Sequence, residues 1–246
     1  MPPTHQQRLA QRVPPSSFRV MKQRWAGLGF FHWALDPAVL ATLIPHGLHL
    51  DTFEGKAWLG IIPFFMQRVR PTGLPPLPWL SWFHELNVRT YVFDDLGNPG
   101  VWFLSLDCNQ PIAVEIARHL FNLPYQHARI SSSSTPSEIH YHSLRKGSPL
   151  GDASFRYPTP TAPQPAAEHS LDWFLVERYR LFSANKKGSL FSGIVHHSPY
   201  LIEPVKSAEI STIPFALNGL PQPSHPPDSL LCAAPVDVTI FPLKKV

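Results

Sequence analysis

Short runs of alternating polar and apolar residues recur along the chain and predict a mostly β protein. The clearest run is Glu85–Phe93, which reads ELNVRTYVF. Because successive side chains of a strand point to opposite sides, one face of this strand is apolar or β-branched. The other face carries Glu85, Asn87, Arg89 and Tyr91. Such a polar face is either an exposed sheet surface or the lining of a ligand cavity, and the alternation alone leaves both open.

Helical spacing is confined to short stretches. The segment LDPAVLATLIPHG predicts two turns of helix capped by Asp36, and PIAVEIARHLF predicts a longer helix from Pro111 to Phe121, with an apolar residue at every fourth position. The segment LDWFLVERYRLFSA predicts one helical turn followed by a strand, and a tight turn is expected at Glu54-Gly55. We therefore expect a mainly β (α+β) fold, an antiparallel barrel or double sheet with two or three short helices. Residues 1–17 are polar and predicted to be flexible, and 18–246 are predicted to form a single domain.

Composition narrows the class of partner and the compartment. The chain of 246 residues has a net charge of +4, yet only 15% of its residues are charged and the basic ones are scattered. No basic helix or stripe is present, which argues against a nucleic-acid or membrane-surface partner. No apolar run is long enough to cross a membrane, and the N-terminus has no secretory signal pattern. Two cysteines are too few for a disulfide framework, so we expect a cytoplasmic protein.

Motifs for the common chemistries are missing. The 13 histidines include three close pairs, but none has the spacing of a zinc site; His140 and His142 share a strand face, which is more typical of a solvated surface than of a chelate. No nucleophile elbow and no phosphate-binding loop occur either, and we predict neither a bound metal nor a cofactor. Lys186 and Lys187 precede a glycine in a predicted turn, and the sequence leaves open whether either amine reaches a cavity.

Several segments together resemble a known family. They are FFHWALDPAVLATLIPHGLHLDTFEGKAWLGIIPFFMQRVRP, ELNVRTYV, PGVWFLSLD, ARHLFNLPYQHARI and FLVERYRLF, and they resemble the bacterial YqjF-like proteins, domain-of-unknown-function family 2071, from about Val20 to Ser211. That family has no established reaction. It is similar in turn to the acetoacetate decarboxylase-like superfamily, whose β-rich fold encloses a ligand cavity.

The resemblance implies a cavity but not the decarboxylase chemistry. In the decarboxylases, a turn after the helix carries a lysine pair, one member of which forms a Schiff base with a β-keto acid. The matching turn here is Leu123–Gln126, LPYQ, and contains no lysine. Glu85 resembles the superfamily's acidic strand residue by position only.

Two functional hypotheses follow. In the first, the chain binds a small carboxylate- or carbonyl-bearing molecule, with or without catalysing a reaction on it: Arg89 binds the carboxylate or carbonyl, Glu85 acts as acid or base, Asn87 orients the ligand and Tyr125 donates a hydroxyl at the cavity mouth. In the second, the chain is a non-catalytic scaffold, a homo-oligomer in which the proline- and tryptophan-rich loop Leu74–Phe83 packs on a partner chain. The sequence names neither the ligand nor the oligomeric state.

Overall fold

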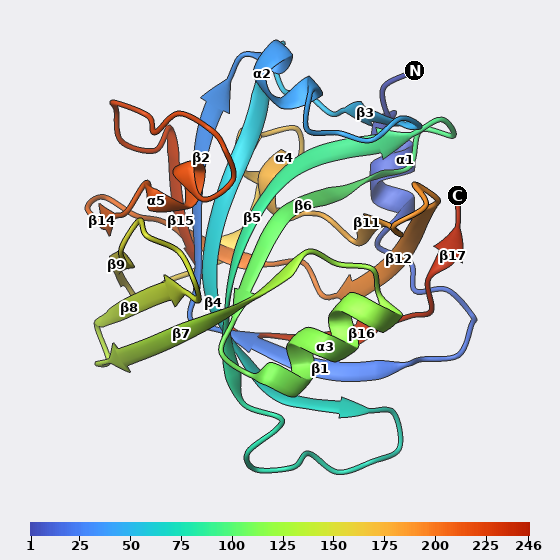
Figure 1. Ribbon diagram of the computed structural model, residues 1–246. Helices are drawn as coiled ribbons and strands as arrows, with labels where there is room; N and C mark the ends of the chain where they lie inside the picture. The colour runs from blue at the N-terminus through green and yellow to red at the C-terminus, as the bar shows by residue number, and fades with distance from the viewer.

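The computed structural model describes residues 1–246 and confirms a mostly β fold (Figure 1). The strands are β1 (Met21–Ala26), β2 (Leu28–Leu35), β3 (Leu48–Leu50), β4 (Ala57–Pro71), β5 (Phe83–Asp94), β6 (Pro99–Cys108), β7 (Tyr125–Ser134), β8 (Glu138–Arg145), β9 (Ala153–Pro158), β10 (Gln164–Pro165), β11 (Arg180–Ala184), β12 (Leu190–His197), β13 (Leu201–Pro204), β14 (Glu209–Ile210), β15 (Ser229–Ala233), β16 (Val236–Ile240) and β17 (Lys244–Lys245). The helices are α1 (His5–Ala10), α2 (Pro37–Ala41), α3 (Pro111–Leu120), α4 (Leu171–Val176) and α5 (Ile213–Ala216).

Seven strands pair in a circuit that returns to its start. β4 pairs with β1 and β5, β5 with β6, β6 with β11, β11 with β12, β12 with β16, and β16 with β1. We call these seven strands the strand ring. The expected antiparallel pairing holds for most of them, but β6 runs parallel to both β11 and β7, so the large sheet is mixed.

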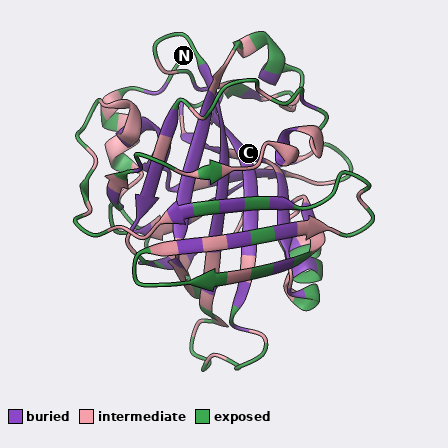
Figure 2. Cartoon of the chain, turned by 90° about the vertical axis from the view of Figure 1, so that its left-hand side faces the viewer, coloured by how far each residue is buried: buried purple, intermediate pink, exposed green.

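A smaller sheet lies across one side of the strand ring. β7, β8 and β9 pair antiparallel, and β14 pairs with β9. Figure 2 shows these strands crossing in front of the long, buried strands behind them. Two cores result. The main core draws on strands of the ring and on α3 and α4, while the outer core lies between the smaller sheet and the strands β2, β4 and β5.

Both faces of β5 are therefore buried. Leu86 and Val88 lie in the outer core, and Tyr91 lies in the main core. The strand predicted from the alternation of ELNVRTYVF is confirmed, but the alternative of an exposed polar surface is wrong, because the polar face turns toward the main core.

Most of the local predictions hold at their positions. Asp36 caps α2, with its side chain accepting a hydrogen bond from the Ala38 backbone N–H. The turn at Glu54-Gly55 has φ angles of 51° and 77°, the left-handed conformation that glycine tolerates best. However, the strand before this turn, β3, pairs with β5 and not with β4.

Helix α3 forms where it was expected, but its apolar stripe points outward. Ile112, Ile116 and Leu120 are 43%, 40% and 67% exposed, whereas Val114 and Ala117 are buried. A neighbouring loop adds Trp79 as a further exposed apolar side chain, and its backbone oxygen accepts a hydrogen bond from Gln110, the cap of α3. This face thus presents apolar groups to solvent.

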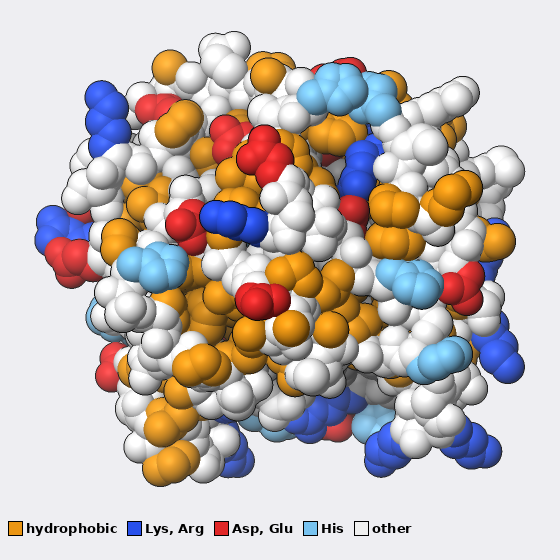
Figure 3. All heavy atoms as spheres, turned by 90° about the horizontal axis from the view of Figure 1, so that it is seen from above, with side chains coloured by type: hydrophobic (Ala, Val, Ile, Leu, Met, Phe, Trp, Pro, Cys, Tyr) orange, Lys and Arg blue, Asp and Glu red, His pale blue; other side chains and the backbone are white.

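The segment of residues 1–17 contains α1, which ion pairs hold against the rest of the chain. The guanidinium of Arg8 contacts Asp51 at 2.6 Å, and that of Arg12 contacts Glu177 at 3.1 Å. The flexibility of residues 1–17 stays a prediction. No helix of the chain is both long and apolar enough to cross a membrane. Seen from above, charged side chains of both signs and histidines lie among apolar ones (Figure 3).

Candidate functional site

The main-core face of β5 brings three of the four predicted site residues into one row. Glu85, Asn87 and Arg89 are only 3%, 6% and 7% exposed. They share a face because a strand alternates its side chains, and β5 is held on both edges, by β4 and β6. Buried polar groups of this kind are costly unless each finds a partner.

Tyr125 joins the row from a distant element. It is the first residue of β7 and directly follows Pro124, the last residue of the segment that connects α3 to β7. Its backbone oxygen accepts a hydrogen bond from the Arg118 side chain at 2.8 Å. Its hydroxyl donates to Oε2 of Glu85 at 2.6 Å. The sequence prediction placed Tyr125 at a cavity mouth; the structure buries it on Glu85.

The Glu85–Tyr125 pair has acid–base character near neutral pH. Burial raises the pKa of Glu85 to about 7, although hydrogen bonds from Tyr125 and Asn87 partly oppose the rise. Burial, followed by the nearby Glu85 charge, raises the pKa of the Tyr125 hydroxyl well above its ordinary value. The carboxyl group can therefore hold or release a proton at neutral pH, while the phenol stays protonated.

Arg89 is buried without an ion pair. Its Nη2 donates only a long hydrogen bond, 3.4 Å, to the Leu175 backbone oxygen, and its Nε has no partner. The guanidinium lies over the rings of Phe30 and Tyr91, at 5.7 Å and 5.6 Å. Beside it on the strand, Oδ1 of Asn87 also lacks a partner. An unpaired donor and an unpaired acceptor thus face the main core together.

Sequence reasoning missed a buried histidine next to Arg89. His32 on β2 is fully buried, and its Nε2 lies 2.6 Å from the Tyr91 hydroxyl. Burial, and secondly the Arg89 charge, lowers the pKa of His32 well below its ordinary value, so the ring is neutral. Gly60 leaves the room for it, since a Cβ there would lie 2.8 Å from Nε2. The only sequence signal was a histidine inside the apolar run GFFHWAL.

A second buried arginine lies between Tyr91 of β5 and Phe174 of α4. Arg178 is buried, contacts Asp51 at 2.6 Å, and stacks over Phe174 and Tyr91 at 4.2 Å and 4.9 Å. Burial alone would raise the pKa of Asp51, but Arg178 and Arg8 outweigh it and hold that pKa below its ordinary value. Arg178 therefore has a protein carboxylate as its partner, which it shares with Arg8, whereas Arg89 has none.

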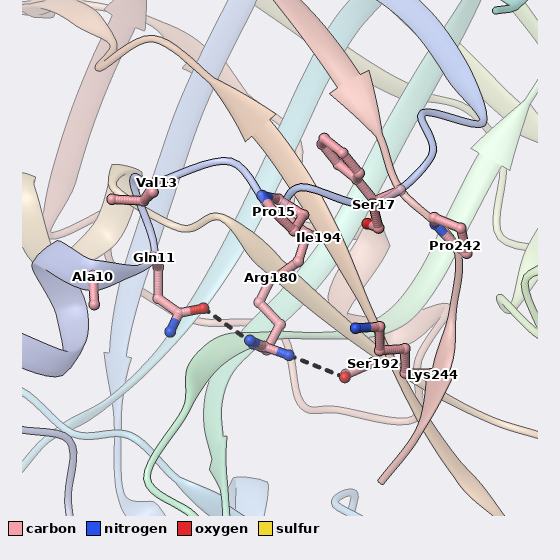
Figure 4. A pocket seen from close by; sticks show the side chains of 11 residues that line it. Ala10, Gln11, Val13, Pro15, Ser17, Arg180, Ser192, Ile194, Pro242 and Lys244 are labelled. Carbon is pink, nitrogen blue, oxygen red and sulfur yellow. Dashed lines mark hydrogen bonds between the residues drawn. The ribbon is translucent and has the colours of Figure 1, made fainter.

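The other sequence candidates lie elsewhere. Lys186 and Lys187 are exposed in the turn between β11 and β12, so neither amine reaches the main core. A surface hollow of about 230 Å³ lies between residues 10–17 and β11–β12, where Arg180 donates to Gln11 at 3.2 Å and to Ser192 at 3.0 Å (Figure 4). A second hollow, of about 260 Å³, is lined by Lys22, Arg24 and other residues of β1, β4 and β16. Neither hollow includes the β5 row.

Known proteins share this fold. Acetoacetate decarboxylase from Legionella pneumophila superposes with a TM-score of 0.62 at 14% identity, covering 95% of this chain and 91% of that chain. The enduracididine biosynthesis enzyme MppR, solved in complex with pyruvate, superposes with a TM-score of 0.62 at 12% identity, covering 94% and 91%. At these identities the similarity establishes the acetoacetate decarboxylase-like fold.

Sequence similarity is higher within one family. "Uncharacterized protein YqjF" of Bacillus subtilis (strain 168) is 38% identical over 233 residues, 94% of each chain. Residues 22–237 match the family DUF2071, "Uncharacterized conserved protein (COG2071)". The resemblance inferred from the segments around ELNVRTYV is thus confirmed, and the chain belongs to the DUF2071 family.

Proposed function

We propose that this chain binds a small carboxylate- or carbonyl-bearing molecule at the β5 row, with Arg89 as its anchor. The observation that carries the proposal is the pair of unpartnered buried atoms, Nε of Arg89 and Oδ1 of Asn87. A guanidinium that is 7% exposed and has no carboxylate within reach is destabilised by burial, and an anionic ligand would supply the missing charge. The proposed ligand class also agrees with the pyruvate complex of the structural neighbour MppR.

Glu85 and Tyr125 then supply proton chemistry at the ligand. A carboxyl group whose pKa is near 7 exchanges a proton with a bound carbonyl compound at neutral pH. The Tyr125 hydroxyl orients that carboxyl through its 2.6 Å hydrogen bond. No amine stands beside them, so the proposed chemistry is proton transfer without an imine intermediate. A cytoplasmic location is part of the proposal and agrees with two free, buried cysteines.

The test is a thermal-shift screen with pyruvate, lactate, acetoacetate and benzoate. A ligand at a hundred times its dissociation constant adds about 2.7 kcal/mol to the free energy of unfolding, which raises the midpoint of a chain this long by several degrees. We expect such a shift in the wild type and its loss in Arg89→Ala. Arg89→Lys should keep only part of it, since an ammonium group cannot bind a carboxylate through two parallel hydrogen bonds.

Arg180→Ala is the matched control, because it removes an arginine from the hollow of Figure 4 and leaves the β5 row intact. Its shift should equal that of the wild type. An equal shift in Arg89→Ala would place the ligand elsewhere, and no shift with any acid would count against the proposal. For each acid that binds, proton NMR then measures whether its hydrogens exchange with solvent deuterium, the reaction expected if Glu85 transfers protons to and from the ligand.

Self-association is a second candidate function, favoured by the outward apolar stripe of α3. Exposed patches of this kind mark interaction sites in many soluble proteins. The stripe of Ile112, Ile116 and Leu120 adjoins the loop that holds Trp79. Light scattering tests it: Ile116→Glu should lower the mass of any oligomer, whereas Leu96→Glu, at an exposed apolar residue at the other end of β6 from α3, should not.

A further inference from the structure

Three metal-binding side chains meet where the N-terminal helix contacts the loop before α4. His5 is the first residue of α1, and Glu168 and His169 directly precede Ser170, the cap of α4. One ligand atom from each of the three lies within 4.8 Å of the others. We propose that His5, Glu168 and His169 bind a single divalent transition-metal ion of the zinc class. This site is separate from the β5 row and does not depend on the proposed function.

The distances suit such an ion. A tetrahedral zinc ion has ligand bonds of about 2.0–2.2 Å, so neighbouring ligand atoms are about 3.4 Å apart. Nε2 of His5 and Oε2 of Glu168 are 3.1 Å apart, close to that spacing. The rings of His5 and His169 are stacked with centroids 4.1 Å apart, so their nitrogens lie side by side, and the exposed His169 ring has to turn out of the stack to point a nitrogen at the same centre.

The surroundings hold these groups in place. Trp173, which is 4% exposed, packs against both imidazole rings, with centroids 5.4 Å from His5 and 6.5 Å from His169. Arg12 contacts Oε1 of Glu168 at 3.5 Å, the oxygen that does not face His5. Ligating carboxylates are commonly oriented by an outer hydrogen bond of this kind. Oε2 therefore remains available to the ion.

The ligand set selects the class of ion. Two imidazoles and one carboxylate suit zinc and other borderline divalent ions better than Mg²⁺ or Ca²⁺, which prefer oxygen ligands alone. Three protein ligands leave a fourth position for water, and Glu168 and His169 are exposed, so water has access. No local sequence pattern indicates the site, because 163 residues separate His5 from Glu168.

The test is a titration of untagged, chelator-treated protein with Zn²⁺ by calorimetry, and with Co²⁺ followed by visible absorption. We expect one ion per chain, and at least a tenfold loss of affinity in each of His5→Ala and His169→Ala. His49→Ala is the matched control, because His49 and Asp95 form an exposed pair at 2.7 Å that is not part of a three-residue cluster. Its affinity should not change.

A second readout follows from the position of the site. An ion held by α1 and by the loop before α4 links two distant segments, so Zn²⁺ should raise the unfolding midpoint of the wild type and of His49→Ala but not of His5→Ala. Circular dichroism checks that the variants are folded. Binding weaker than about 1 mM in the wild type, or unchanged affinity in the double variant His5→Ala/His169→Ala, would overturn the proposal.

Discussion

Glu85→Gln should remove a large part of the pH dependence of stability. In the folded chain burial raises the pKa of this carboxyl to about 7, against an ordinary value of 4.5. Between these values the folded state holds a proton that the unfolded state has released. The free energy of unfolding therefore falls as pH rises through this window. Below it the contribution of Glu85 is complete, and above pH 7 it is lost.

The magnitude follows from the size of the shift. Each pKa unit corresponds to about 1.4 kcal/mol, so the displacement of Glu85 is worth about 3 kcal/mol between pH 4.5 and pH 7. Glutamine has nearly the same shape, stays neutral at every pH, and can still accept the hydrogen bond from Tyr125 through its side-chain oxygen. It should therefore keep the protonated-state contacts without the titration.

Urea unfolding of both proteins at pH 5, 6, 7 and 8 measures the difference. Other buried carboxyl groups, Asp107 among them, contribute equally to both curves, so the wild-type curve minus the Glu85→Gln curve isolates Glu85. We expect the wild type to lose about 2.5 kcal/mol more than the variant across this range, because part of the full shift falls below pH 5. Parallel curves would refute the argument that Glu85 is buried with a raised pKa.

Two further substitutions test the polar groups around the β5 row. Asp51→Asn leaves the buried Arg178 guanidinium without its carboxylate and should lower the free energy of unfolding in urea by about 3–5 kcal/mol. Asp95→Asn, at an exposed ion pair, should lower it by less than about 1 kcal/mol, and similar losses in the two variants would contradict this account. Gly60→Ala should lower the free energy of unfolding by about 1–3 kcal/mol, because its Cβ would lie 2.8 Å from the His32 ring. If this contact is the cause, the double variant Gly60→Ala/His32→Ala should lose less than the sum of the losses in the two single variants.

Local sequence signals were sufficient for β5, α2 and α4, because strand alternation and helix capping depend on neighbouring residues. They failed for β7, whose second half reads SSSS and lacks the β-branched and aromatic residues typical of strands. The segments IHYHSL and ASFRY do predict β8 and β9, but without β7 nothing indicated that they form a separate sheet that covers the second face of β5. The outward stripe of α3 could not be predicted either, since its apolar spacing alone does not say which face meets the core.

The candidate site was predictable in part for the same reason. Glu85, Asn87 and Arg89 follow each other on one strand, so their common face could be deduced. The contact of Tyr125 with Glu85 joins residues 40 apart, and that of Arg178 with Asp51 joins residues 127 apart. Such contacts depend on the strand pairing of the whole fold, which no local pattern encodes.

The environment of Tyr125 also explains why a lysine there would not restore imine chemistry. In Tyr125→Lys the new amine would face the Glu85 carboxyl in place of the hydroxyl, which lies 2.6 Å from it. A neighbouring carboxylate favours the charged ammonium, and only the free amine attacks a carbonyl. Pyruvate with borohydride should therefore leave Tyr125→Lys unlabelled at pH 7 by mass spectrometry. In Tyr125→Lys/Glu85→Gln the carboxylate is gone, and burial alone lowers the lysine pKa, so we expect a reduced pyruvate adduct. Equal labelling of both variants would refute this electrostatic account, and labelling of neither would mean that a keto acid does not reach the β5 row.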